Sequence, residues 1–282
     1  MELKSFRESR RRRWSRRLAR LHLLCRLPGE PVALLDYDRH RIHLGISSPM
    51  EYHTRLHSCK KEPETIAWIE QVFRAGDVFY DIGANVGTYS LVSAAYWRDL
   101  VQVVAFEPSA INYARLVRNL LLNGFEKRVI PLAVALAEKT SLSTFHYENF
   151  TAGGSLHALG ERKDFRDKDF SPTASCPMMA FDLDTLVGQL GLPQPTHLKL
   201  DVDGTELLIL QGAHRTLQGV RSILVELDDS HPQTPQVRAL LREQGFKEAA
   251  HYRYRYGNLY PKFRGISNVI FHKRNAESSN SG

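Results

Sequence analysis

The residues of this sequence best suited to chemistry are acidic side chains and glycines that follow predicted strands. An apolar run at residues 78–80 is followed by Asp81, then by a turn that contains Gly83 and Gly87, and then by an apolar-rich segment typical of a helix. Glycine permits positive φ and close backbone approach, and a helix N-terminus offers free amide N–H groups. The pattern predicts a nucleotide-binding turn, with a tight turn that binds nothing as the alternative.

This turn differs from the two commonest nucleotide-binding motifs. Its glycines have the spacing G-x-x-x-G rather than G-x-G-x-x-G, and the Gly-Lys-Ser/Thr of a P-loop is missing. Glu107 ends the next predicted strand, where a carboxylate can accept hydrogen bonds from both ribose hydroxyls. Its negative charge suits a cationic ligand and disfavours a 2′-phosphate.

A nucleoside cofactor with a positive charge and no pyrophosphate fits these features, and S-adenosylmethionine is such a molecule. We expect Asp81 to hold its ammonium group and Glu107 to bind its ribose. The candidate cofactor-binding residues are Asp81, Gly83, Asn85, Gly87, Glu107 and Val134, the last at the end of the third predicted strand.

A second group of polar residues lies in the KLDVDGTE segment that begins at Lys199. Side chains alternate along a strand, so Lys199, Asp201 and Asp203 share one side if the strand continues. A lysine inside a buried sheet needs a partner, and Asp201 is in reach. The pair could orient a hydroxyl or accept its proton, with Glu226 in the same cleft. Asp201 and Asp203 could instead bind Mg²⁺, or Asp203 could simply cap a helix.

The elements that position these residues alternate between strands and helices. Predicted strands lie at residues 78–80, 101–106, 129–134, 197–202 and 222–227. Repeated strand–helix units require a mostly parallel sheet with helices on both faces, and ligands bind outside the carboxyl ends of its strands. Residues 141–147 and 177–182 are predicted as a strand pair around a polar insert, and 252–256 and 266–272 as a closing hairpin that turns at Gly257-Asn258.

These patterns divide the chain of 282 residues into four parts. They are a basic arm (1–30), a small hairpin extension (31–61), a main α/β domain (62–274) with an insert (149–175), and a polar tail (275–282) expected to be disordered.

The net charge of +7 belongs to the arm, because residues 1–26 hold ten Lys/Arg and two acids. The arm is predicted to be a helix with Trp14, Leu18 and Leu21 on one face. Three interpretations remain open: a solvated appendage, a peripheral contact with an anionic membrane, and a nucleic-acid contact. The near-neutral body argues against nucleic acid.

Three cysteines without Cys-x-x-Cys spacing, and no apolar run of membrane-spanning length, favour a reducing, cytoplasmic location. The first residues also lack the apolar stretch of a signal peptide. A cytoplasmic protein with a membrane-peripheral arm fits these features.

With these residues in place, the sequence resembles the FkbM family of S-adenosylmethionine-dependent methyltransferases. The matching segments are FYDIGANVG (79–87), AFEP (105–108), PLAVALA (131–137), GGSL (153–156), FDLDTL (181–186) and HLKLDVDGTE (197–206). The resemblance implies a class I methyltransferase Rossmann-like fold, a seven-stranded sheet whose last strand is antiparallel. Asp203 stands where the family more often has glutamate.

The resemblance implies methyl transfer to oxygen on a sugar, glycolipid or secondary-metabolite hydroxyl. In that case Asp201, Lys199 and Glu226 would be the catalytic residues, and the 149–175 insert a lid over the acceptor. Two alternatives remain: a non-catalytic scaffold with this fold, and an RNA methyltransferase that uses the arginine-rich arm.

Overall fold

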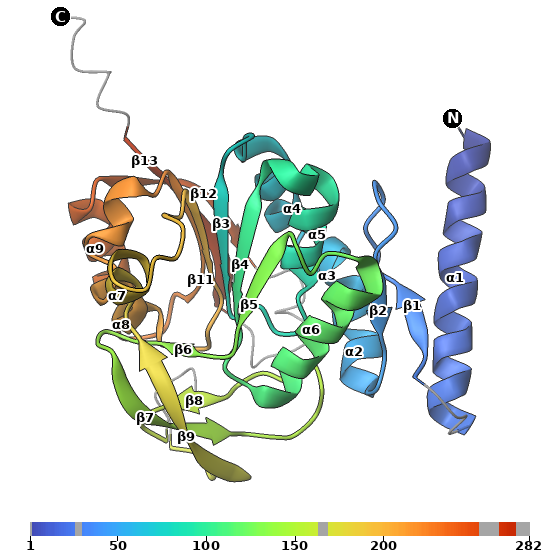
Figure 1. Cartoon of the computed structure of the whole chain (residues 1–282), viewed down its shortest axis with the longest axis horizontal. Helices are drawn as coiled ribbons and strands as arrows, with labels where there is room; N and C mark the ends of the chain where they lie inside the picture. Colours follow the sequence, from blue (N-terminus) through green and yellow to red (C-terminus); the bar gives the residue numbers. More distant parts are fainter. Residues whose placement is uncertain (1, 26–29, 163–168, 254–264, 275–282) are drawn as a thin grey trace, which may run out of the picture.

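A seven-stranded sheet forms the centre of this computed structural model, which describes residues 2–25, 30–162, 169–253 and 265–274. Its strands lie in the order β12-β13-β11-β10-β3-β4-β5 (Figure 1). Their bounds are β3 (Val78–Ile82), β4 (Gln102–Phe106), β5 (Val129–Leu132), β10 (His197–Leu200), β11 (Ser222–Asp228), β12 (Phe246–Arg253) and β13 (Ile266–Lys273). β3, β4, β5, β10 and β11 are parallel, whereas β13 is antiparallel to β11 and to β12. The predicted sheet is confirmed, including its antiparallel last strand.

Helices cover both faces of this sheet. The bounds are α4 (Pro63–Val72), α5 (Thr88–Trp97) and α6 (Ala110–Asn123) for one face, and α7 (Leu183–Gly188), α8 (Glu206–Gln211) and α9 (Thr234–Glu243) for the other. Because strand side chains alternate, Phe79 packs with Trp68 of α4, whereas its neighbour Tyr80 belongs to the cluster of α7, α8 and α9. The two layers hold the strand ends in fixed positions.

Local signals in the sequence set the limits of α6, which lies beside the site. The Ser109 hydroxyl accepts a hydrogen bond from the Asn112 amide at the first turn, and Gly124 ends the helix in the left-handed region (φ 68°). The helix therefore ends at Asn123, directly before Gly124.

A second, four-stranded sheet lies below the first in Figure 1, in the order β6-β9-β7-β8. Its strands are β6 (Ala135–Leu136), β7 (Ser141–Tyr147), β8 (Ala158–Leu159) and β9 (Ala174–Phe181). The antiparallel β7–β9 pair confirms the predicted strand pair. The prediction that the third strand runs to residue 134 is wrong: β5 ends at Leu132, because the chain turns there to pair β6 with β9.

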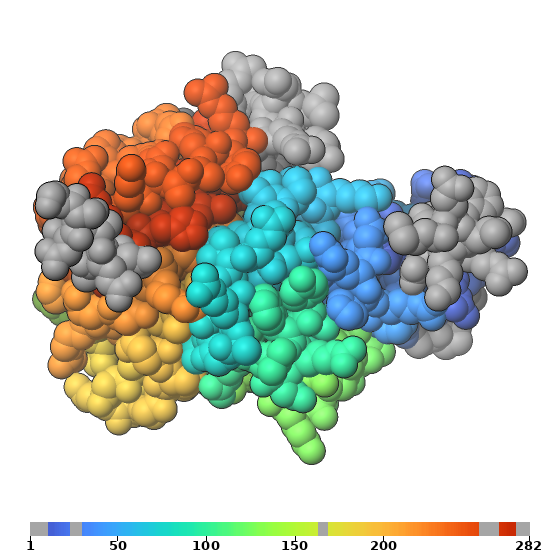
Figure 2. Space-filling view, turned by 90° about the horizontal axis from the view of Figure 1, so that it is seen from above, coloured from blue at the N-terminus to red at the C-terminus, as the bar shows by residue number. Residues whose placement is uncertain are grey.

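The N-terminal segments lie at one end of the molecule, opposite the last strands (Figures 1 and 2). They are α1 (Glu2–Cys25), β1 (Val32–Leu34), β2 (His43–Gly45), α2 (Pro49–His53), a 3-10 helix (Arg55–His57) and α3 (Ser58–Lys61). β1 and β2 form the predicted antiparallel hairpin. One face of α1 is docked on the body, because Arg12 pairs with Asp38 and Ala19 is buried.

Within the described residues, no helix is both long enough and apolar enough to cross a bilayer.

His197 is buried in the core at the start of β10, away from the carboxyl ends of the strands. Its Nε2 lies 2.8 Å from Asp77 Oδ2, its Nδ1 lies 2.7 Å from Ser222 Oγ, and its ring stacks on Phe73 at 4.2 Å. Burial lowers the pKa of His197 to about 4, although Asp77 opposes the shift. The imidazole is therefore neutral in the folded protein at pH 7.

This histidine should make stability depend on pH. Its pKa is about 4 when folded and about 6.5 when unfolded, so its contribution is complete above pH 6.5 and is lost as pH falls towards 4. We expect the difference in unfolding free energy between wild type and His197→Gln to shrink by about 3 kcal/mol from pH 7 to pH 4. Urea unfolding of both proteins at pH 7 and pH 4 measures this difference. The carboxyl groups that also titrate in this range are present in both proteins, so their contribution cancels when the two free energies are subtracted. A difference that stays constant with pH would refute this role.

Candidate active site

A cavity of about 870 Å³ opens at the carboxyl ends of the parallel strands. The strand ends contribute residues within 82–85, 106–108 and 201–205 together with Glu226. Further lining residues lie within 145–159 of the second sheet and its loops and within 50–61 of the N-terminal extension. The cavity is therefore enclosed by three parts of the chain that are far apart in sequence.

Glu107 lines this cavity at the end of β4 and holds the turn that follows β3. Its Oε2 accepts a hydrogen bond from the Asn85 amide (2.7 Å), and its Oε1 accepts one from the Ser109 amide (2.9 Å). Burial raises the pKa of Glu107 to about 7, against the effect of these hydrogen bonds. Each oxygen keeps a second lone pair, so the carboxyl can still receive hydroxyl donors from a ligand.

Gly83 brings the turn against the segment that carries Asp201. Its φ is 81°, and a Cβ added there would lie 1.9 Å from the backbone oxygen of Asp201. Only glycine fits both the conformation and the contact. Gly87 has a different task, because it caps the N-terminus of α5 in the left-handed region (φ 89°) and does not line the cavity.

Asp81 is fully buried and is not part of the cavity wall. Its Oδ2 accepts hydrogen bonds from the amide (3.0 Å) and the hydroxyl (2.6 Å) of Ser90, and its Oδ1 has no partner among the described residues. Burial raises the pKa of Asp81, and the nearby Lys199 opposes that shift. Direct binding of an ammonium group by Asp81 stays a prediction, and the geometry favours a supporting role behind the turn.

Lys199 and Asp201 form the ion pair that the sequence predicted. Lys199 Nζ donates to Asp201 Oδ2 at 2.8 Å; the lysine side chain is 1% exposed, whereas that of Asp201 is 30% exposed and lines the cavity. Burial alone would raise the pKa of Asp201, but the Lys199 ammonium outweighs it and holds the pKa below its usual value. Asp201 thus presents a carboxylate to the cavity, and Lys199 supports it from behind.

Two residues that the sequence did not single out complete this arrangement. The Lys199 ammonium lies 4.9 Å from the centre of the Tyr89 ring, and the Tyr89 hydroxyl donates to Glu62 Oε2 at 2.7 Å. Glu62 also pairs with Lys61 at 2.7 Å. No spacing rule joins Glu62, which precedes α4, to Tyr89 in α5, so only the folded chain reveals the contact.

Glu226 lines the same cavity at β11. Burial, with the charges of Asp201 and Glu62, raises its pKa well above its usual value. The shift is towards the protonated form of the carboxyl group, which can donate a hydrogen bond.

Asp203 connects the strand end to the insert. It has positive φ (56°), and its Oδ2 accepts a hydrogen bond from the Leu156 amide at 2.7 Å. Burial and the charge of Asp201 raise the pKa of Asp203 to about 6.

The proposed Mg²⁺ ligands, Asp201 and Asp203, do not fit that ion well. One oxygen of each already binds a donor, and the Lys199 ammonium adds a positive charge beside them. The described residues include no cluster of three or more His, Cys, Asp or Glu that could hold a metal ion.

The glycine pair of the insert is tied down over the site. The Asn85 and Asn112 amide groups donate to the Gly154 carbonyl at 2.8 and 2.9 Å, and the Gly153 amide donates to Asn112 Oδ1 at 2.9 Å. This part of the insert is therefore anchored to the turn after β3 and to α6.

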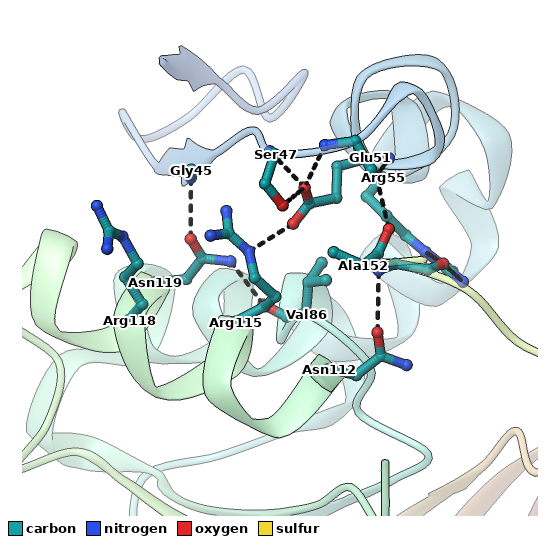
Figure 3. A network of polar contacts seen from close by, with 12 residues as sticks. Gly45, Ser47, Glu51, Arg55, Val86, Asn112, Arg115, Arg118, Asn119 and Ala152 are labelled. Atoms are coloured by element: carbon teal, nitrogen blue, oxygen red, sulfur yellow. Dashed lines mark hydrogen bonds and ion pairs between the residues drawn. The ribbon is translucent and has the colours of Figure 1, made fainter. Parts of the chain in front are cut away.

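The polar face of α6 also holds the N-terminal extension, as Figure 3 shows. Arg115 pairs with Glu51 (Nε to Oε1, 2.7 Å) and with Glu30, while Asn119 Oδ1 accepts the Gly45 amide at 2.9 Å. This attachment explains how residues 50–61 come to line the cavity, which the sequence had not indicated.

The fold is that of a class I methyltransferase, a mostly parallel seven-stranded sheet with an antiparallel last strand. A model of the methyltransferase FkbM domain matches residues 81–248, which is more than half of the chain. The chain therefore belongs to the FkbM methyltransferase family, and the predicted resemblance is confirmed.

The named relatives are methyltransferases. Hexuronic acid methyltransferase AglP of Haloferax volcanii is 27% identical over 173 residues, which cover 61% of this chain and 65% of the relative. The 31-O-demethyl-FK506 methyltransferase FkbM of Streptomyces tacrolimicus is 29% identical over 196 residues, with coverages of 63% and 75%. A crystal structure of methyltransferase FkbM from Methylobacillus flagellatus has a TM-score of 0.45 at 14% identity, covering 70% of this chain and 43% of its own.

Proposed function

We propose that this protein is an S-adenosylmethionine-dependent O-methyltransferase that acts on a hydroxyl of a sugar, glycolipid or secondary metabolite. The observation that carries the proposal is Asp201, which is paired with the buried Lys199 and lines the cavity together with Gly83 and Glu107. The names of two relatives, a hexuronic acid methyltransferase and a 31-O-demethyl-FK506 methyltransferase, support the acceptor class.

The residues around the turn fit the cofactor. Glu107 would bind the ribose hydroxyls, Gly83 and Asn85 would shape the backbone around the nucleoside, and Val134 would line the same cavity. Buried acids nearby, Asp81 among them, favour a positive charge. S-adenosylmethionine supplies a methyl group on a sulfonium, which is already a good leaving group, so the protein's main task is positioning.

The acceptor side uses Asp201 and Glu226. Asp201 would accept the hydrogen bond, and then the proton, of the acceptor hydroxyl. Lys199 keeps Asp201 ionised and fixes its direction through the 2.8 Å contact. Glu226, which lines the same cavity, would help to bind the acceptor. Nothing in this scheme depends on a metal ion.

Cofactor binding provides the direct test. Isothermal titration calorimetry should detect S-adenosylmethionine binding, and Glu107→Gln should weaken it about tenfold or more, since a carboxylate acceptor is lost. Glu126→Gln, at an exposed position, is the matched control. Radiolabelled methyl transfer to a panel of lipid-linked glycans and secondary-metabolite alcohols identifies the acceptor. A protein that binds the cofactor but methylates nothing would support the scaffold alternative, and absence of binding would refute the proposal.

The outward face of α1 supports a peripheral contact with an anionic membrane. Trp14, Leu18 and Leu21 are 59%, 63% and 57% exposed there, and the exposed Arg11 and Arg17 flank them. Flotation with vesicles containing phosphatidylglycerol should recover the protein, and Leu18→Glu should reduce that recovery. Salt-sensitive binding to RNA, with no recovery on vesicles, would favour the nucleic-acid alternative instead.

A further inference from the structure

One wall of the cavity is basic and comes from outside the family-matched region. Residues 53–61 contribute His53, Arg55, His57, Lys60 and Lys61, which we call the basic wall. Burial and nearby cations lower the pKa of His57, so its ring is neutral at pH 7. The positive charge of the wall therefore comes from Arg55, Lys60 and Lys61, all of which precede residue 81, where the family match begins.

The acidic residue next to this wall does not neutralise it. Glu51 is 1% exposed, accepts hydrogen bonds from Ser47 and Ser48, and pairs with Arg115 instead. Lys61 pairs with Glu62 behind the cavity. Arg55 donates to the Gly153 carbonyl, which carries no charge. In the part of the chain that the structure describes, neither Arg55 nor Lys60 forms an ion pair with a carboxylate.

The basic wall is also held rigidly. The buried Asp36 accepts hydrogen bonds from the Cys59 and Lys60 amides, both at 3.0 Å, and so fixes the first turn of α3. Arg55 is fixed by two hydrogen bonds to Gly153 (2.7 and 3.0 Å). A ligand that binds here therefore loses little free energy in ordering the wall.

The two sides of the cavity thus differ in chemistry: the strand ends carry the carboxyl groups of Glu107, Asp201 and Asp203. The basic wall carries Arg55 and Lys60, which have no carboxylate partner in the described part of the chain. We propose that the basic wall binds an oxyanion of the acceptor, a carboxylate or a phosphate, while the acceptor hydroxyl faces Asp201. This inference rests on the proposed function and adds to it that the acceptor is negatively charged. Guanidinium and ammonium groups are the usual partners of both oxyanions.

The test measures binding rather than turnover. Calorimetry on the full-length protein saturated with S-adenosylhomocysteine would compare glucuronic acid, glucose 6-phosphate and glucose, which differ in carrying a carboxylate, a phosphate or no charge. We expect at least one charged sugar to bind more than tenfold more tightly than glucose, and the better one identifies the oxyanion. Lys60→Gln should weaken its binding about tenfold. Lys127→Gln, an exposed lysine after α6, should leave it unchanged.

The outcomes separate this inference from the proposed function. Saturation with S-adenosylhomocysteine tests the cofactor site by itself, and its failure contradicts the proposed function. If the cofactor product binds, but glucose binds as well as both charged sugars or neither charged sugar binds, the oxyanion site is refuted. The same conclusion follows if Lys60→Gln and Lys127→Gln behave alike.

Discussion

Asp201→Asn is expected to reduce the rate of methyl transfer by about a hundredfold or more, with little change in S-adenosylmethionine affinity. The amide keeps the shape of the side chain but loses the charge that Lys199 holds at 2.8 Å, and general-base groups typically contribute 10² to 10⁴ in rate. Single-turnover radiolabel transfer measures the rate, and calorimetry measures the affinity.

Two further variants make this result interpretable. Asp99→Asn removes an exposed carboxylate paired with Arg128 and should change neither quantity. Asp81→Asn disturbs the buried support of the turn and should abolish cofactor binding. If Asp201→Asn loses cofactor affinity as severely as Asp81→Asn, the division between a cofactor side and an acceptor side is wrong.

Gly83→Ala is expected to cost about 4 kcal/mol or more in unfolding free energy, together with most of the cofactor affinity. Positive φ alone costs an L-residue roughly 1–2 kcal/mol, and the new Cβ would also lie 1.9 Å from the Asp201 carbonyl oxygen. Since the contact is with backbone, relief requires either the turn or the Asp201 segment to move. Urea unfolding and calorimetry measure the two effects.

Gly76→Ala is the matched control. Gly76 has almost the same φ, 88° against 81°, but a Cβ there would meet nothing within 4 Å. Gly76→Ala should therefore lower the unfolding free energy by about 1 kcal/mol and should leave cofactor binding intact. Equal losses of unfolding free energy in the two variants would mean that backbone strain alone, and not the close approach to Asp201, makes glycine necessary at position 83.

The parallel part of the central sheet was predictable because β3, β4, β10 and β11 are largely apolar and have an acid at or near their carboxyl ends. Their parallel order follows from the alternation with helices. The smaller elements were not predictable in this way. β6 and β8 have two residues each, and their pairing with β9 and β7 depends on distant parts of the chain. The predicted turn at Gly257-Asn258 and the predicted tail at 275–282 lie outside the described residues.

The candidate site was also predictable only in part. Gly83, Glu107 and Asp201 line the cavity, as expected, because strand ends meet at one edge of a parallel sheet. Their functional roles stay predictions. Asp81 was placed less well, because β3 continues to Ile82 and alternation turns the Asp81 side chain towards Ser90 under α5. Arg55 was missed because short helices without periodicity bring it to the cavity, although the run of His, Arg and Lys over residues 53–61 was a visible signal.

The polar face of α6 has a consequence for how this enzyme can change its substrate. Asn112 and Arg115 hold the insert and the extension respectively, and both project from one helix of the core domain. A chimera whose new N-terminal extension has no acidic residue at the position of Glu51 would leave the buried Arg115 without this partner. In such a chimera, α6 has to be replaced together with the extension, so that each buried cation keeps its acidic partner.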